Sequence, residues 1–292
     1  MTPVNGNLQN IKKISQKMVL SSQTNRVYFS RLLSADYKPL YEKMTGALHQ
    51  HGIETGLLEG TKDYWCRDYM PIQVDREKFI QYTYDPDYLK TPEWKDYKTD
   101  PAKPLSHLSI QTEDMTDIVL DGGNVVKTPW HVIMTEKVIE ANDHIDETVL
   151  RKRLEEAFGK DVIILPWWDR REDYCGHTDG MVRYIKDKEL LIGDYQLFAP
   201  ERSAELHRTL EGYGYIVHDL ELPWHVADAL AYVNFLQTSK IILQPALHRK
   251  TDDSALRCIE ELYDVPVVQI EAPYIIGKYG GAFNCMTWNI LV

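Results

Sequence analysis

Hydrophobic residues recur at helical spacing in four separate segments of the chain. In the first segment Leu40, Met44 and Leu48 lie four residues apart, and Gly52 follows as a stop signal. The other three segments show similar spacing, and a short apolar run typical of a buried strand follows each of them. The pattern predicts helices over residues 36–51, 146–158, 200–211 and 252–263, and strands at about residue 53 and over residues 162–165, 216–220 and 267–270.

The predicted strands indicate an internal repeat. They start near residues 53, 162, 216 and 267, so the intervals are 109, 54 and 51 residues. Because the first interval is about twice the others, we expect a fifth unit near residue 107, where residues 105–110 precede another apolar run. The helix of this unit is missing. Residues 85–104 carry four prolines in its place and are interpreted as a loop insertion, either a plain surface excursion or a lid over a site.

One polar residue occupies nearly the same position in every unit. Asp68, Asp121, His177, Asn234 and Cys285 are separated by 53, 56, 57 and 51 residues. Taken alone, each has an ordinary structural explanation, such as a surface ion pair, a core histidine, a helix cap or a buried inert thiol. If the five units surround an axis, however, all five residues converge on it. The sequence therefore predicts a central site.

The chemistry of such a site follows from its residue types. A cysteine, a histidine and three carboxylates (Asp68, Asp121 and Asp179) supply a nucleophile, a general acid/base and a clamp for a cation. Carboxylates that pair with a planar cation select guanidinium, whose N–H donors form a fixed fork. A metal site suits this mixture of ligands poorly, and a cysteine peptidase would leave the three carboxylates unexplained. We therefore expect no metal and no organic cofactor.

The composition of the chain limits the classes of binding partner and the cellular compartment that we expect. The net charge of −11 argues against binding to nucleic acid through a basic face. No apolar run approaches the length needed to span a bilayer, and the polar first ten residues predict no signal peptide. The four scattered cysteines indicate neither a disulfide framework nor a zinc site. We expect a cytoplasmic protein with no membrane partner, and leave a homodimer open.

The chain resembles the guanidino-group-modifying superfamily, the penteins, and within it the agmatine deiminase and bacterial peptidylarginine deiminase branch. The matching segments occur in the family's order: WCRDYMP at 65–71, LDGGN at 120–124, GHTDGMVRYI at 176–185, YVNFL at 232–236 and GGAFNC at 280–285. The resemblance implies a single α/β catalytic domain over residues 1–292. Its fold would be a five-bladed, pseudo-fivefold α/β propeller with the active site on the central axis.

The resemblance also implies roles for the catalytic residues. Cys285 corresponds to the nucleophile, and His177 to the general acid/base. Asp179 and Asp68 correspond to the carboxylates that hold the guanidinium, and Asp121 to the residue that assists the histidine. The substrate-binding residues implied are Trp65, which would form a wall beside the alkyl chain of the substrate, and Arg67, Asn234, Gly122 and Gly281.

Three departures from the family pattern bear on the substrate. Asp121 stands where glutamate is usual, so its carboxylate must come from a closer backbone or act through water. Asn284 stands where a histidine often precedes the catalytic cysteine. Tyr69 and Met70 replace the small residue and glycine that commonly precede the proline. These changes leave the chemistry intact.

The activity implied is that of a cysteine-dependent hydrolase that deiminates a small cationic guanidino compound. The reaction would pass through a covalent thiouronium intermediate and release ammonia. Agmatine is the leading substrate, with N-carbamoylputrescine as the product, a step of putrescine biosynthesis. The alternatives are an arginine or peptidylarginine deiminase, a dihydrolase or an amidinotransferase on the same fold, or a catalytically silent binder of cationic ligands. An arginine substrate would need a cation for its α-carboxylate, and the candidates are Arg67, Arg170, Arg171 and Arg183.

Overall fold

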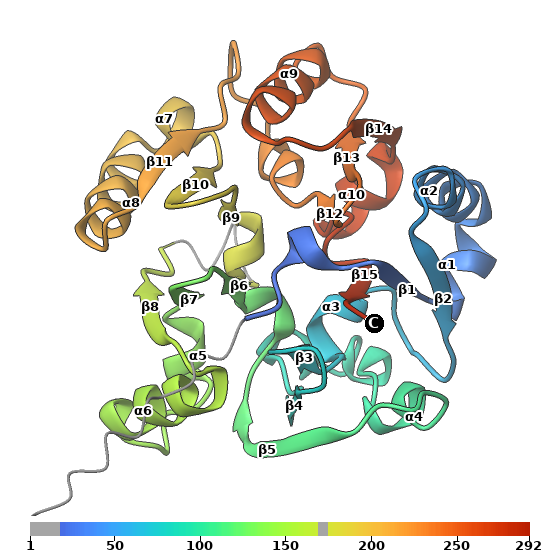
Figure 1. Cartoon of the computed structure of the whole chain (residues 1–292), viewed down its shortest axis with the longest axis vertical. Coiled ribbons are helices and arrows are strands. Elements are labelled where there is room, and N and C mark those ends of the chain that lie inside the picture. The colour runs from blue at the N-terminus through green and yellow to red at the C-terminus, as the bar shows by residue number, and fades with distance from the viewer. Residues whose placement is uncertain (1–17, 169–174) are drawn as a thin grey trace, which may run out of the picture.

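The computed structural model describes residues 18–168 and 175–292, and within them the strands form five three-stranded sheets. In each sheet the first strand runs antiparallel to the middle strand, and the middle strand runs parallel to the third. The sheets surround a central axis, and most of the larger helices lie on the outer rim (Figure 1). The expected pseudo-fivefold α/β arrangement is confirmed.

The first sheet combines the two ends of the described chain. Its order is β15 (Thr287–Ile290), β1 (Arg26–Ser30) and β2 (Glu54–Leu58), and Arg26 pairs with Ile290 across the antiparallel ladder. The other four sheets, in chain order, are β3 (Ile72–Gln73), β4 (Phe79–Thr83) and β5 (Thr112–Val119); β6 (Val126–Lys127), β7 (His131–Thr135) and β8 (Asp161–Leu165); β9 (Val182–Tyr184), β10 (Glu189–Ile192) and β11 (Ile216–Asp219); and β12 (Leu236–Gln237), β13 (Ile242–Ala246) and β14 (Val267–Glu271).

Helices connect the middle and third strands, as a parallel crossover requires. These connecting helices are α1 (Arg31–Asp36) and α2 (Lys38–Gln50), α5 (Lys137–Glu140) and α6 (Glu147–Phe158), α7 (Tyr195–Phe198) and α8 (Pro200–Gly212), and α9 (Asp252–Leu262). The four predicted helices are therefore confirmed as α2, α6, α8 and α9. The first begins later than expected, because the backbone of Tyr37 (φ −126°, ψ 44°) separates α2 from α1.

Local signals set the ends of α6. The side chain of Asp146 accepts hydrogen bonds from the backbone N–H groups of Thr148 and Val149, which caps the first turn. Gly159, at φ 65°, ends the helix in the left-handed region that glycine adopts without strain. The apolar face of the helix is buried against the strands of the third sheet and its neighbours.

The second unit carries the predicted insertion in place of a long helix. Between β4 and β5 lie only short helices: η2 (Asp87–Leu89), η3 (Lys95–Tyr97) and α4 (Ala102–Leu105). Its third strand begins at Thr112 rather than near residue 107, which corrects the expected position of the fifth unit. The physical reason is that β5 is an edge strand whose residues are mostly polar and exposed, so no apolar run marks it.

Short turns at the axis connect the third strand of one unit to the first strand of the next. They are α3 (Cys66–Tyr69), η4 (Gly122–Asn124), η5 (Thr178–Gly180), η6 (Ala229–Tyr232) and, after α10 (Pro273–Tyr279), the loop before β15. Every residue of the predicted central set lies in or beside one of these turns. The repeat observed in the sequence therefore corresponds to a repeated structural position.

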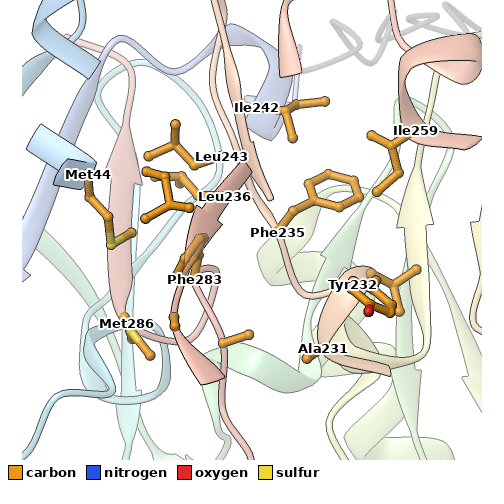
Figure 2. Close-up of a cluster of buried hydrophobic side chains, with 14 of the residues drawn as sticks. Met44, Ala231, Tyr232, Phe235, Leu236, Ile242, Leu243, Ile259, Phe283 and Met286 are labelled. Atoms are coloured by element: carbon orange, nitrogen blue, oxygen red, sulfur yellow. The ribbon is translucent and has the colours of Figure 1, made fainter. Parts of the chain in front are cut away.

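An apolar core holds the loop that carries Cys285. Phe283 and Met286, on either side of this residue, are completely buried and belong to a cluster with Met44 from α2 and Leu236 from β12 (Figure 2). The cluster spans the first and fifth sheets and their helices, so the position of Cys285 depends on packing between two units. No helix of residues 18–168 and 175–292 combines the length and apolar character needed to cross a membrane.

Replacing Phe158 by alanine tests the packing of α6. Phe158 is 1% exposed, so Phe158→Ala should lower the free energy of unfolding by about 3–5 kcal/mol. The measurement is urea-induced unfolding followed by circular dichroism. Val149 is on the same helix and 50% exposed, so Val149→Ala should change stability by less than about 0.5 kcal/mol. Equal losses in the two variants would contradict the burial described here.

Candidate active site

The structure brings the five predicted catalytic residues together at the axis. Asp68 lies in α3, Asp121 and His177 immediately precede η4 and η5, Asp179 lies in η5, and Cys285 immediately precedes Met286 and β15. Their exposed fractions lie between 2% for Asp179 and 8% for Cys285. Four different units therefore supply one buried cluster of titratable groups.

His177 lies between two carboxylates. Its Nε2 is 3.1 Å from Oδ2 of Asp121, and its Nδ1 is 3.5 Å from Oδ1 of Asp68. Burial disfavours the imidazolium, but the two carboxylates outweigh burial and raise the pKa of His177 to about 9. The contact with Asp121 is direct, so the shorter carboxylate reaches the histidine without an intervening water.

Asp68 is held by a second donor and stays only weakly acidic. Its Oδ1 accepts a hydrogen bond of 3.0 Å from the backbone N–H of Gly123. Burial and the neighbouring carboxylates of Asp121 and Asp179 raise the pKa of Asp68 to about 7, against the opposing effect of His177. A Cβ on Gly123 would lie 2.6 Å from both Oδ1 of Asp68 and Nδ1 of His177, so this turn approaches the pair only because it lacks a side chain.

Cys285 faces Asp179. Its Sγ is 3.7 Å from Oδ2 of Asp179, and its backbone N–H donates to Oδ1 of Asn234 at 3.3 Å. Burial, followed by the charges of Asp179 and Asp68, raises the pKa of the Cys285 thiol well above its usual value. The group is therefore a thiol at neutral pH.

Asp179 retains hydrogen-bonding capacity. Its Oδ2 accepts a hydrogen bond of 2.6 Å from the side-chain amide of Asn284. Its Oδ1 is buried and has no hydrogen-bond partner within the part of the chain that the structure describes. A buried carboxylate oxygen without a donor is costly, so this atom is suited to accept one from a bound cation.

Arg67 and Asn234 fix the loop that carries Cys285. The guanidinium of Arg67 donates to the carbonyl oxygen and Oδ1 of Asn284, at 3.3 Å each, and to Oδ1 of Asn289. The carbonyl oxygen of Asn234 accepts from the backbone N–H of Asn284 at 3.0 Å. Contact of Arg67 and Asn234 with a substrate stays a prediction.

Two glycines allow close packing of the turns. A Cβ on Gly281 would lie 2.5 Å from Cζ3 of Trp65, and a Cβ on Gly122 would lie 2.0 Å from the carbonyl oxygen of Arg67. The Trp65 ring also packs edge-on against Tyr279, with 6.0 Å between centroids. The proposed substrate-binding roles of Gly122, Gly281 and Trp65 stay predictions.

Two of the four arginines considered as partners for a substrate α-carboxylate lie within the described residues, and two do not. Arg170 and Arg171 lie outside the described residues. Arg183 is buried on β9, where its guanidinium lies 4.6 Å from the centroid of the Phe235 ring. Arg67, as described above, is held by two asparagines.

Sequence reasoning missed Lys137, the first residue of α5. Its Nζ lies 3.3 Å from Oδ2 of Asp121 and 2.9 Å from Oδ1 of Asp87. The only signal available was a lysine two residues after the predominantly apolar strand β7, which is too common to single out a site residue. Among residues 18–168 and 175–292, no group of three or more His, Cys, Asp or Glu side chains could hold a metal ion. Independence from metals stays a prediction.

Several solved structures share this fold. The agmatine deiminase of C. jejuni is 16% identical, with a TM-score of 0.73, over 94% of this chain and 96% of that chain. The agmatine deiminase of Enterococcus faecalis is 17% identical, with a TM-score of 0.73, over 94% and 95%. DDAH from Pseudomonas aeruginosa is 12% identical, with a TM-score of 0.59, over 92% and 100%. At these identities the likeness establishes the fold alone.

Comparison with curated proteins finds no match. The family model described as Porphyromonas-type peptidyl-arginine deiminase matches residues 13–290, nearly the whole chain. The resemblance to the penteins is thereby confirmed, and the chain belongs to the Porphyromonas-type peptidyl-arginine deiminase family.

Proposed function

We propose that the protein is a cysteine-dependent hydrolase that deiminates a small guanidino compound. The observation that carries the proposal is the pairing of Cys285 with Asp179. A thiol lies 3.7 Å from one oxygen of a carboxylate whose other oxygen has no partner among the described residues. A planar cation bound to that carboxylate would place its central carbon beside Sγ.

The carboxylates support binding of a guanidinium cation. Asp68 and Asp179 both lie close enough to Cys285 for their charges to raise the pKa of its thiol. A guanidinium presents N–H donors in a fixed planar fork and can hydrogen-bond to two carboxylates at once. Its positive charge would offset theirs, so the pKa of the thiol would fall when the substrate binds. The nucleophile would then be activated by the substrate itself.

The proposed reaction has two halves. When the substrate binds, the thiol of Cys285 loses its proton to solvent. The thiolate attacks the guanidinium carbon, and the imidazolium of His177 donates a proton to the departing nitrogen, which leaves as ammonia as its C–N bond breaks. Neutral His177 then takes a proton from water, and the resulting hydroxide attacks the thiouronium carbon. The C–S bond breaks, the thiolate is released, and a ureido product remains. Asp121, on the far side of the imidazole from Asp68, supports the proton transfers.

Agmatine is the proposed substrate, with N-carbamoylputrescine as the product. Two of the similar structures are described as agmatine deiminases. Arg67, one of the arginines considered for a substrate α-carboxylate, is already bound by Asn284 and Asn289. Agmatine has no α-carboxylate and needs no such cation. Peptidylarginine is the alternative that the family description suggests.

A substrate panel tests the proposed function. Agmatine, free arginine, methylarginines and blocked arginine are assayed for ammonia, urea and ureido product. We expect ammonia and a ureido product in equal amounts from agmatine, with kcat/KM at least about tenfold higher than for the other compounds.

Dialysis against EDTA should leave the rate unchanged, because the side chains already supply the nucleophile and the proton carrier. Urea as a product, or activity restored only by a divalent ion, would overturn the proposal.

Cys285 is predicted to be the nucleophile. Cys285→Ala should lower kcat by about a thousandfold or more, because no covalent intermediate can form. A haloacetamidine should alkylate this thiol, as mass spectrometry of the peptide would show. The matched control is Cys258→Ala, since Cys258 lies on α9 away from the cluster. Retention of more than a few per cent of activity in Cys285→Ser would exclude the covalent route.

The three carboxylates are predicted to divide the work. In a Cys285→Ala background, Asp68→Asn and Asp179→Asn should weaken calorimetric binding of an unreactive guanidine, since each removes a hydrogen-bonded charge worth about 1.5–3 kcal/mol. Asp121→Asn should leave that affinity nearly unchanged. With Cys285 intact, Asp121→Asn should instead lower kcat about a hundredfold.

The pH dependence of kcat should report the protonation of His177, which Asp121 supports. The imidazolium of His177 is lost as pH rises through its pKa of about 9, so kcat should fall there. Asp121→Asn removes a charge that raises this pKa, and the fall should move toward the ordinary value of about 6.5. Asp143→Asn, at an exposed position, is the control.

In the calorimetric binding experiment, equal affinity losses in Asp68→Asn, Asp179→Asn and Asp121→Asn would show that Asp121 also contacts the substrate.

A further inference from the structure

Lys137 connects the predicted insertion to the histidine. Oδ2 of Asp121 contacts both Nε2 of His177 at 3.1 Å and Nζ of Lys137 at 3.3 Å. The same Nζ lies 2.9 Å from Oδ1 of Asp87, which belongs to η2 in the insertion between β4 and β5. Three charged groups from three elements thus form a continuous chain that ends at the imidazole.

Aromatic rings enclose this chain of charges. Nζ of Lys137 lies 4.8 Å from the centroid of the Tyr88 ring and 5.4 Å from that of Trp167. The Tyr88 ring packs edge-on against the His177 ring, with 6.2 Å between centroids. Lys137 itself is only 5% exposed. Because a buried ammonium is costly unless it is paired, its position must be maintained by the two carboxylates and the rings.

We infer that Lys137 is a positioning residue for the His177–Asp121 pair, and that Asp87 connects it to the insertion. The inference rests on the proposed function, in which His177 carries the proton. Lys137 has two effects on the pair. It holds the carboxylate of Asp121 in the orientation that meets Nε2, and its positive charge limits the basicity that the carboxylates give to the imidazole.

Among the described residues, several charged groups lie around the His177–Asp121 pair. His177 is faced by Asp68 from α3, by Asp121, by Lys137 and by the Tyr88 ring. The carboxylates raise the pKa of His177 and Lys137 lowers it. The charges on Asp121, Asp87 and Cys175 in turn favour the charged form of Lys137. Without Lys137 the imidazolium would be a weaker acid and would release its proton less readily to the departing nitrogen.

The test compares three variants of the full-length protein by NMR. The imidazole of His177, one of ten histidines, is titrated with isotope-labelled histidine and assigned with His177→Gln. Lys137→Met should raise the pKa of His177 by about one unit, because a nearby positive charge is lost. Lys137→Arg should restore most of the original value. Asp87→Asn should lower it, because a negative charge is lost instead.

The direction in which the pKa of His177 moves distinguishes loss of the Lys137 charge from loosening of Asp121. The inference requires the charge of Lys137 to outweigh its hold on Asp121. If the hold alone mattered, loss of Lys137 would loosen Asp121 and move the pKa of His177 down, toward about 6.5. A fall or no change in Lys137→Met would therefore overturn the inference, as would a rise in Asp87→Asn. The control is Lys98→Met, which removes an ion pair with Asp85 inside the same insertion and should leave the pKa unchanged.

Kinetics supply the second readout. Lys137→Met should lower kcat by about tenfold or more, leave KM within about twofold, and shift the alkaline fall of kcat to higher pH. The NMR titration needs no turnover, so it tests the inference even if the substrate panel shows no deimination. Absence of deimination together with the expected NMR shifts would defeat the proposed function alone. Normal deimination without those shifts would defeat the role of Lys137 alone.

Discussion

The antiparallel pairing of β15 with β1 is the interaction on which the site depends. It joins two segments from opposite ends of the described chain and completes the first sheet. The same ladder fixes the loop that carries Cys285, which lies two residues before the start of β15 at Thr287. Without this pairing, the thiol would not meet Asp179 from the fourth unit, and β1 and β15 would expose unpaired edges. Closure of the ring is therefore a condition for the chemistry as well as for the fold.

Closure also concentrates negative charge where solvent cannot screen it. Asp121 is offset by Lys137 and His177, and Asp68 by His177 and a backbone N–H. Among the described residues, Asp179 accepts a hydrogen bond from the neutral amide of Asn284 and faces the thiol of Cys285, and the buried guanidinium groups of Arg67 and Arg183 interact with it through their charge alone. The direct contacts are therefore uneven: Asp121 and Asp68 each meet a positively charged side chain, whereas Asp179 has no ion pair among the described residues. We propose that a cationic ligand supplies the missing ion pair and binds beside Cys285.

The sequence predicted those parts of the molecule whose cause is local or repeated. The helix α6 was predictable because one face is apolar and Gly159 ends it, and the phase of residues such as His177 and Cys285 followed from the repeat. The strand β5 was misplaced, because a polar edge strand leaves no hydrophobic pattern. Lys137 was missed for a different reason. Its partners Asp87 and Asp121 come from other elements, and only the folded chain brings them together.

Two of the three departures from the family pattern, Asp121 and Asn284, have a physical explanation in the structure. Asp121 is shorter than glutamate, yet it reaches Nε2 of His177 at 3.1 Å, because the glycines after it allow the turn to approach closely. Lys137 binds the same carboxylate oxygen and restrains it. At the other side, the amide of Asn284 donates to Asp179 and accepts from Arg67, a dual role that one neutral amide can fill. Because that amide does not titrate, the pKa of the Cys285 thiol is raised by burial and by the charges of Asp179 and Asp68, and we propose that a bound cation lowers it again.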